Sequence, residues 1–144
     1  PTSLNAEHCL EVRPKPERVC DVDYILANLE DASLTIVDAR GSKRFFGQMP
    51  EPRAGVRSGH IPGAVNLPFE RVLEGSKFKN KEALKELFHA LKPGAQTYIC
   101  SCGSGVTACI LLLAADVAGI DSTRLYDGSW ADWGSREDLP IETD

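Results

Sequence analysis

The segment from residue 97 to 118 constrains the fold of this 144-residue chain more than any other. It starts with a short β-branched and aromatic run, Thr97 to Ser101, which predicts a buried strand. A glycine-bearing turn, Cys102 to Gly105, follows directly, and the next residues, Val106 to Ala118, are apolar enough to predict a helix buried nearly all round. A strand, a tight turn and a buried helix in succession favour an α/β domain with a mainly parallel sheet.

The same alternation continues on both sides of this segment. Short apolar runs predict further strands at Leu34 to Val37, Ala64 to Leu67 and Arg124 to Tyr126. Helical spacing predicts a helix after the N-cap candidate Asp21, with Val22, Ile25, Leu26 and Leu29 on its apolar face, and further helices over Lys81 to Leu91 and Asp127 to Trp133. Residues 41 to 62 show no period and predict a long loop, and long ordered loops are usually functional.

Length and charge exclude several classes of protein. The length fits one domain, and the net charge of −5, with scattered Lys and Arg, gives no basic patch for nucleic acid or for an anionic membrane surface. No apolar run is long enough to cross a bilayer, and the first residues have no secretory h-region. Residues 1 to 18 are rich in proline without a sustained period, which is typical of an arm or linker. We expect neither a nucleic-acid nor a membrane partner.

Five cysteines at irregular spacing favour reduced thiols in a reducing compartment. Cys102 stands between a predicted strand and the start of a predicted helix, where backbone N–H groups and the helix dipole stabilise a thiolate. It is therefore the candidate nucleophile, with a buried structural thiol as the alternative. Cys100 and Cys109 are interpreted as small core residues, whereas Cys9 and Cys20 receive no role.

No metal or cofactor is expected. Cys100 and Cys102 are two residues apart, and the other nearby ligand types, Cys109 and His60, do not give zinc-like spacing.

The sequence CGSGVTA from Cys102 to Ala108 resembles the active-site loop of the rhodanese superfamily, particularly its 3-mercaptopyruvate sulfurtransferases. The segments VDAR, RSGHIPGAVNLP and LYDGSWADW resemble family segments in the same order, from about Val19 to the end of the chain. The resemblance implies an α/β fold, with a single rhodanese-like domain and a mainly parallel five-stranded sheet flanked by helices. It also implies that residues 19 to 144 are the catalytic domain of a tandem protein, in which another rhodanese domain precedes residues 1 to 18.

The resemblance implies that Cys102 takes sulfur from a small-molecule donor as a persulfide and passes it to cyanide or to a thiol acceptor such as thioredoxin. Gly103, Gly105 and Val106 would complete the loop. The hydroxyls of Ser104 and Thr107 would assist catalysis, with helix capping as the alternative.

Arg44 and Arg53 resemble the pair that binds the donor carboxylate, a task suited to the planar guanidinium. The alternative for both is ordinary solvated surface charge. The loop itself contains no Arg or Lys, which argues against the doubly charged thiosulfate as donor.

Two other functions remain as alternatives: a thiosulfate sulfurtransferase and a non-catalytic rhodanese interaction module. A cysteine phosphatase with a rhodanese-like fold is disfavoured. The phosphatase requires an Arg six residues after its Cys, and here that residue is Ala108. Asp38 is interpreted as a structural acceptor and His60 as part of a rigid turn, so no acid is assigned to the reaction. We therefore expect full activity to need the preceding domain. We expect the protein in the cytoplasm, with mitochondria as the alternative.

Overall fold

The computed structural model describes residues 11 to 143 and is built around one five-stranded sheet. The strands of this sheet are β1 (Val19–Cys20), β2 (Leu34–Asp38), β3 (Val65–Asn66), β6 (Thr97–Ser101) and β7 (Thr123–Tyr126). They are ordered β1-β7-β6-β2-β3, and all four pairings are parallel. The α/β class and the parallel five-stranded sheet predicted from the sequence are confirmed.

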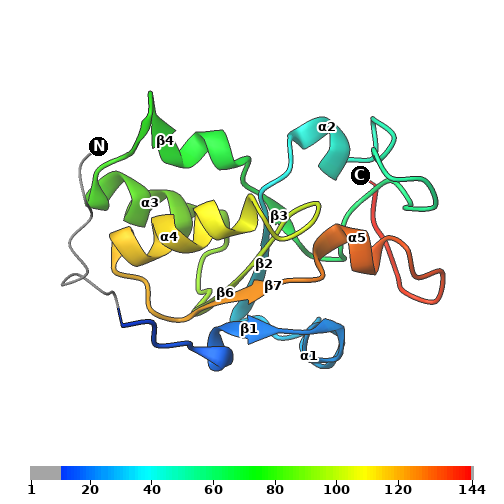
Figure 1. Cartoon of the computed structure of the whole chain (residues 1–144), viewed down its shortest axis with the longest axis horizontal. Helices are drawn as coiled ribbons and strands as arrows, with labels where there is room; N and C mark the ends of the chain where they lie inside the picture. Colours follow the sequence, from blue (N-terminus) through cyan, green and yellow to red (C-terminus); the bar gives the residue numbers. More distant parts are fainter. Residues whose placement is uncertain (1–10, 144) are drawn as a thin grey trace, which may run out of the picture.

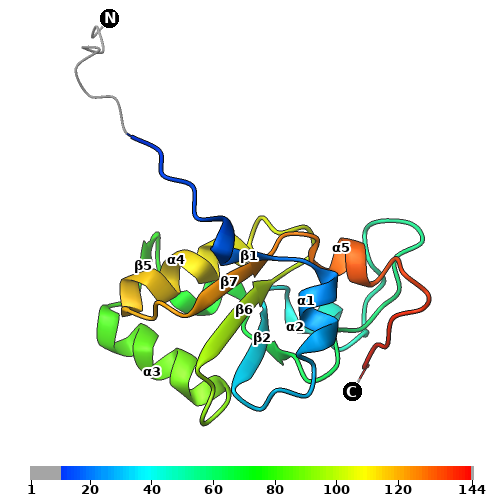
Figure 2. The same cartoon turned by 90° about the horizontal axis from the view of Figure 1, so that it is seen from below.

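Helices cover both faces of the sheet. The helices are α1 (Val22–Ala27), α2 (Ser42–Phe45), α3 (Lys81–Leu91), α4 (Ala108–Ala118) and α5 (Ser129–Trp133). Figures 1 and 2 show α3 and α4 together on one side of the sheet and α1 on the other. Each face has its own apolar core: Val37 and Cys100 pack with α3 and α4, whereas Ile36 and Ile99 pack with α1 and α5. Neighbouring residues of one strand point to opposite faces, so the same strands contribute side chains to both cores.

Local sequence signals explain where the helices begin and end. The carboxylate of Asp21 accepts from the Tyr24 amide 3.0 Å away and caps α1 as predicted. Asn80 caps α3 in the same way through the Ala83 amide, and Gly119, with a φ of 77°, ends α4. Leu26, predicted on the buried face of α1, is 39% exposed. A helix of six residues buries only Val22 and Ile25.

Several short elements differ from the sequence prediction. The predicted loop over residues 41 to 62 contains the one-turn helix α2, and a two-stranded hairpin of β4 (Leu73–Glu74) and β5 (Lys77–Phe78) was not anticipated. Two 3-10 turns, Pro16–Arg18 and Phe69–Val72, complete the fold. Elements of two to four residues carry too few side chains for periodicity to show.

Helix α4 starts two residues later than predicted, because Val106 and Thr107 belong to the turn before it. The expectation that it would be buried all round is wrong: Leu113 is 52% and Val117 is 40% exposed. No described helix is long and apolar enough to cross a membrane.

The amino-terminal boundary of the domain is not sharp in the described residues. Arg18, inside the predicted linker, forms an ion pair of 2.8 Å with Asp116 of α4, and β1 begins at the next residue. Cys9 lies outside the described residues.

Candidate active site

The carboxyl ends of β2, β6 and β7 meet at one edge of the sheet, and the candidate site lies there. The register pairs Asp38 of β2 with Ser101 of β6, and Cys100 of β6 with Leu125 of β7. Cys102 therefore follows the central strand, flanked by the loops that leave β2 and β7. In parallel α/β sheets this edge is where ligands bind.

The loop from Cys102 to Thr107 turns sharply into α4, and two glycines allow it to do so. Gly105 has a φ of 85°, and a Cβ there would lie 2.9 Å from the carbonyl oxygen of Asp127. A Cβ at Gly103 would lie 3.0 Å from Nη2 of Arg44. The loop thus packs closely against both the β7–α5 connection and the Arg44 guanidinium, and a side chain at position 103 or 105 would push them apart.

Hydrogen bonds within this loop stabilise a thiolate at Cys102, which is only 2% exposed. Burial alone raises the pKa of this thiol. The Thr107 hydroxyl and the amides of Ser104, Thr107 and Ala108 donate to the sulfur, outweigh burial and bring the pKa below its ordinary value. This is the arrangement that the chemistry of a nucleophilic sulfur requires.

The structure gives the two candidate hydroxyls different positions. Thr107 occupies the N-cap position of α4 but makes no capping hydrogen bond, and its hydroxyl instead faces the sulfur. Ser104 is exposed and reaches the sulfur through its amide. Val106, at the tip of the loop, is 72% exposed. The loop therefore offers amides and one hydroxyl to the sulfur and an apolar side chain to solvent.

Cys102 is the only described cysteine whose pKa is lowered. Burial raises the pKa of Cys20 to about 11 and that of Cys100 to about 12, and burial also raises the pKa of Cys109. All four are free thiols. Of these four thiols, the fold therefore favours ionisation of Cys102.

Both predicted substrate arginines lie beside the loop. Arg44 and the exposed Arg53 line a hollow of about 180 Å³ that also reaches Gly103 and Ser104. Arg44 borders a second hollow, of about 210 Å³, which reaches Cys102 itself. Arg44 therefore borders both hollows, whereas Arg53 lies at the rim of the first only.

A buried carboxylate that sequence reasoning missed orients Arg44. The side chain of Glu51 is 4% exposed and accepts from Nη2 of Arg44 at 2.5 Å and from Nη1 of Arg40 at 2.9 Å. Arg40 in turn is bound to Asp38 at 2.7 Å, and its guanidinium lies 4.7 Å from the Trp130 ring centroid. Asp38 thus accepts hydrogen bonds from Arg40, which agrees with its predicted role as a structural acceptor. A Glu between two prolines carries no signal of burial, so only the fold reveals this chain of ion pairs.

His60 lies away from the sulfur. Its ring stacks on Phe45 with centroids 3.8 Å apart, and Nδ1 is 2.9 Å from the Phe45 carbonyl oxygen. Nε2 is 3.6 Å from the Glu142 carboxylate, and the hollow that His60 borders does not include Cys102. The ring holds the chain between Phe45 and the carboxyl-terminal segment.

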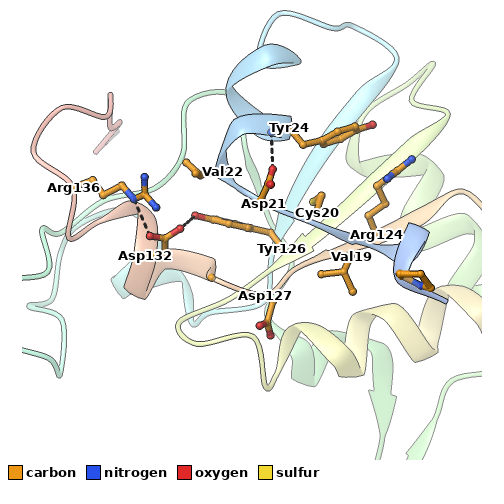
Figure 3. Close-up of a pocket in the computed structure, with 12 residues that line it drawn as sticks. Val19, Cys20, Asp21, Val22, Tyr24, Arg124, Tyr126, Asp127, Asp132 and Arg136 are labelled. Atoms are coloured by element: carbon orange, nitrogen blue, oxygen red, sulfur yellow. Dashed lines mark hydrogen bonds and ion pairs between the residues drawn. The ribbon is translucent and has the colours of Figure 1, made fainter. Parts of the chain in front are cut away.

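A larger hollow of about 660 Å³ lies at the ends of β1 and β7 (Figure 3). Several of its polar side chains contact one another. Asp132 accepts hydrogen bonds from the Tyr126 hydroxyl at 2.7 Å and from Arg136 at 2.8 Å. The Arg124 guanidinium lies over the Tyr24 ring. Cys102 is not part of its wall. Among residues 11 to 143 no group of three or more His, Cys, Asp or Glu is placed to hold a metal ion.

The sequence of this chain matches a known protein family. Residues 21–136 match the rhodanese-like domain family, and the chain belongs to that family.

Named relatives include both kinds of sulfurtransferase. The chain is 40% identical over 128 residues to the 3-mercaptopyruvate sulfurtransferase of Escherichia coli (strain K12), covering 88% of this chain and 46% of that protein. It is 42% identical over 124 residues to the thiosulfate sulfurtransferase of Bos taurus, covering 84% of this chain and 41% of that protein.

A solved structure of the same fold is the sulfur transferase subunit of yeast mitochondrial complex I, with a TM-score of 0.75 and 38% identity over 91% of this chain and 48% of that one. The chain thus spans less than half the length of the relatives that it matches.

Proposed function

We propose that this domain is the persulfide-forming part of a 3-mercaptopyruvate sulfurtransferase. The observation that carries the proposal is the thiol of Cys102, held by three amides and a hydroxyl that favour its anion, with Arg44 over the adjacent glycine. The named relatives at about 40% identity support the same reaction class. A non-catalytic module would need neither a thiolate nor a guanidinium at this edge.

The proposed reaction has two steps. The Cys102 thiolate attacks the donor sulfur, the carbon–sulfur bond breaks, and its electron pair leaves on the enolate of pyruvate. A general acid protonates the enolate, and the donor thiol gives up its proton to solvent, so that no net proton is consumed. Cys102 then holds the outer sulfur as a persulfide anion, stabilised by the same amides that stabilised the thiolate. An acceptor thiolate, such as that of thioredoxin, or cyanide attacks the outer sulfur and returns Cys102 as a thiolate.

The full-length protein and its location are part of this proposal. We infer that residues 1 to 18 link the catalytic domain, residues 19 to 144, to a preceding rhodanese domain, since the relatives are more than twice as long as the matched region. The free thiols are suited to a reducing compartment, the cytoplasm or alternatively the mitochondrion.

The charge of the site favours mercaptopyruvate over thiosulfate. Two arginines and one glutamate, Arg44, Arg53 and Glu51, line the hollow beside the loop, which leaves one net positive charge for one carboxylate. Thiosulfate is a dianion and would leave one negative charge without a partner. We expect a higher kcat/KM for mercaptopyruvate when the two donors are compared at equal concentrations and a common acceptor. A higher kcat/KM for thiosulfate would refute the donor assignment and leave the persulfide chemistry standing.

Removal of either arginine should weaken the oxo-acid reaction. Arg44→Ala and Arg53→Ala should each lower kcat/KM for mercaptopyruvate. The corresponding loss of transition-state stabilisation is about 1.5 to 3 kcal/mol, the size of a hydrogen bond to a charged group. Arg44→Ala leaves Glu51 paired with Arg40, so the fold should persist. Lys43→Ala is the matched control, because it removes one exposed positive charge that does not line the hollow. Equal losses in the control and in the arginine variants would show a general effect of charge.

A further inference from the structure

Ser129 has a backbone conformation that serine seldom adopts. Its φ is 51°, and it is the one non-glycine residue with positive φ in the described part of the chain. It is also completely buried. A left-handed serine is unfavourable and is retained where its surroundings impose it, frequently beside a functional site.

The side chain of Ser129 connects two strand ends. Its hydroxyl donates to the carbonyl oxygen of Tyr126, the last residue of β7, at 2.9 Å. The same oxygen accepts from the backbone amide of Cys102, just after β6, at 3.1 Å. A residue 27 positions along the chain therefore holds the amide of the nucleophile.

The residues after Ser129 hold the other side of the nucleophile. The amide of Trp130 donates to the carbonyl of Cys102, and the amide of Ala131 donates to the carbonyl of Gly103, each at 2.9 Å. Helix α5 is itself tied to β7, because the Tyr126 hydroxyl donates to Asp132, as Figure 3 shows. Both peptide groups of Cys102 are thus hydrogen-bonded to the junction between β7 and α5, which fixes the direction of the Cα–Cβ bond of Cys102.

We propose that Ser129 is a positioning residue of the sulfur site, whose buried hydroxyl fixes the main chain of Cys102 so that the sulfur points into the ring of loop amides. This inference rests on the proposed function in so far as the thiolate is the reacting group. Ser129 does not touch the donor. It acts through Cys102.

Two substitutions separate the hydroxyl from the backbone conformation. Ser129→Gly removes the hydroxyl but accepts the positive φ without strain, whereas Ser129→Ala removes the hydroxyl and keeps the strain. Ser101→Ala is the matched control, because it deletes another buried hydroxyl, adjacent to Cys102, that has no hydrogen-bond partner within residues 11 to 143. Iodoacetamide alkylation of Cys102, followed as a function of pH, measures the thiolate and needs no sulfur donor.

We expect both Ser129 variants to alkylate about threefold to tenfold more slowly at neutral pH, the range of one lost hydrogen bond, with the midpoint of the pH profile moved upward. Ser101→Ala should keep the profile of the unmodified protein. A Ser129→Gly profile equal to that of the unmodified protein would overturn the proposal, and so would an equal change in Ser101→Ala.

A second measurement does not depend on the variants folding. In the unmodified protein the amide hydrogen of Cys102 should exchange with solvent far more slowly than that of Val106 at the loop tip. Equal exchange rates would also overturn the proposal. If the pH profile shifts as expected but mercaptopyruvate yields no persulfide, Ser129 still positions Cys102 and the proposed function fails.

Discussion

Replacement of Cys102 by serine should abolish sulfur transfer. The expected loss is at least about 10⁴-fold, because a hydroxyl cannot carry the transferred sulfur and no other step bypasses it. Incubation of the unmodified protein with mercaptopyruvate should add one sulfur atom to the peptide that contains Cys102, which peptide mass spectrometry detects. Persulfide found chiefly on Cys9, Cys20, Cys100 or Cys109 would contradict the assignment.

The cysteine variant needs a control at a second thiol. Cys109→Ser is suitable because Cys109 is exposed, close in sequence to the loop, and bonded through its sulfur to the Gly105 carbonyl at 3.4 Å, a bond that serine can also make. This variant should keep full persulfide formation. Loss of transfer in both variants would indicate that the thiols act together, which the single lowered pKa does not predict.

The same pKa shifts predict the pH dependence of alkylation. Because the pKa of Cys102 is below that of an ordinary thiol, its alkylation rate should rise and level off at a pH where free cysteine is still mostly protonated. Cys20 and Cys100, with pKa values near 11 and 12, should remain unmodified over that range. Among the cysteines of residues 11 to 143, only Cys102 is expected to be alkylated at neutral pH.

The strand–turn–helix unit around Cys102 could be predicted because its signals are local. The run Thr97 to Ser101 becomes β6 without change, and the amphipathic pattern of Lys81 to Leu91 becomes α3 with the same ends. In each case neighbouring residues alone carry the pattern. The turn between β6 and α4 is equally local, since the two glycines stand where the chain must pass close to other groups.

The parts of the site that could not be predicted depend on contacts far apart in sequence. Glu51 is buried only because Arg40 and Arg44 converge on it, and Ser129 is recognisable only when the ends of β6 and β7 lie side by side. A polar residue in a loop gives the same local signal whether it is solvated or enclosed. The two-residue strand β1 was missed for a related reason: pairing with β7, and not its own two side chains, makes it a strand.

Supplying the rhodanese domain that we propose precedes this one should raise turnover strongly, because among residues 11 to 143 no carboxyl, imidazole or ammonium group lines the hollow that reaches Cys102. Breaking the carbon–sulfur bond leaves an enolate that must be protonated, and general acid catalysis is typically worth about 10² to 10⁴ in rate. Three carboxylates lie around the loop. Asp127 lies beside Gly105 but does not line the hollow that reaches Cys102, Glu51 is held between two arginines, and Asp38 is bound to Arg40. His60 borders a different hollow and contacts Phe45.

The open geometry of the site leads to the same expectation. Arg53, which lines the hollow beside Gly103 and Ser104, is exposed. Val106, which lines the hollow that reaches Cys102, is exposed as well, so water has access to both hollows. A surface that covered this edge would exclude water and strengthen the attraction between Arg44 and the donor carboxylate.

The test compares turnover of mercaptopyruvate by residues 1 to 144 alone and by the same residues joined to the preceding domain, with alkylation of Cys102 as the control for folding. We expect equal alkylation in the two proteins, because the amides that stabilise the thiolate all belong to this chain. Turnover should rise by about 10² to 10⁴ when the domain is present, the contribution expected from a general acid. Equal turnover in the two proteins would show that the proton comes from within this domain. The variants His60→Gln and Glu51→Gln would then identify the proton donor, since only the variant that removes the general acid should lower kcat without changing the alkylation rate.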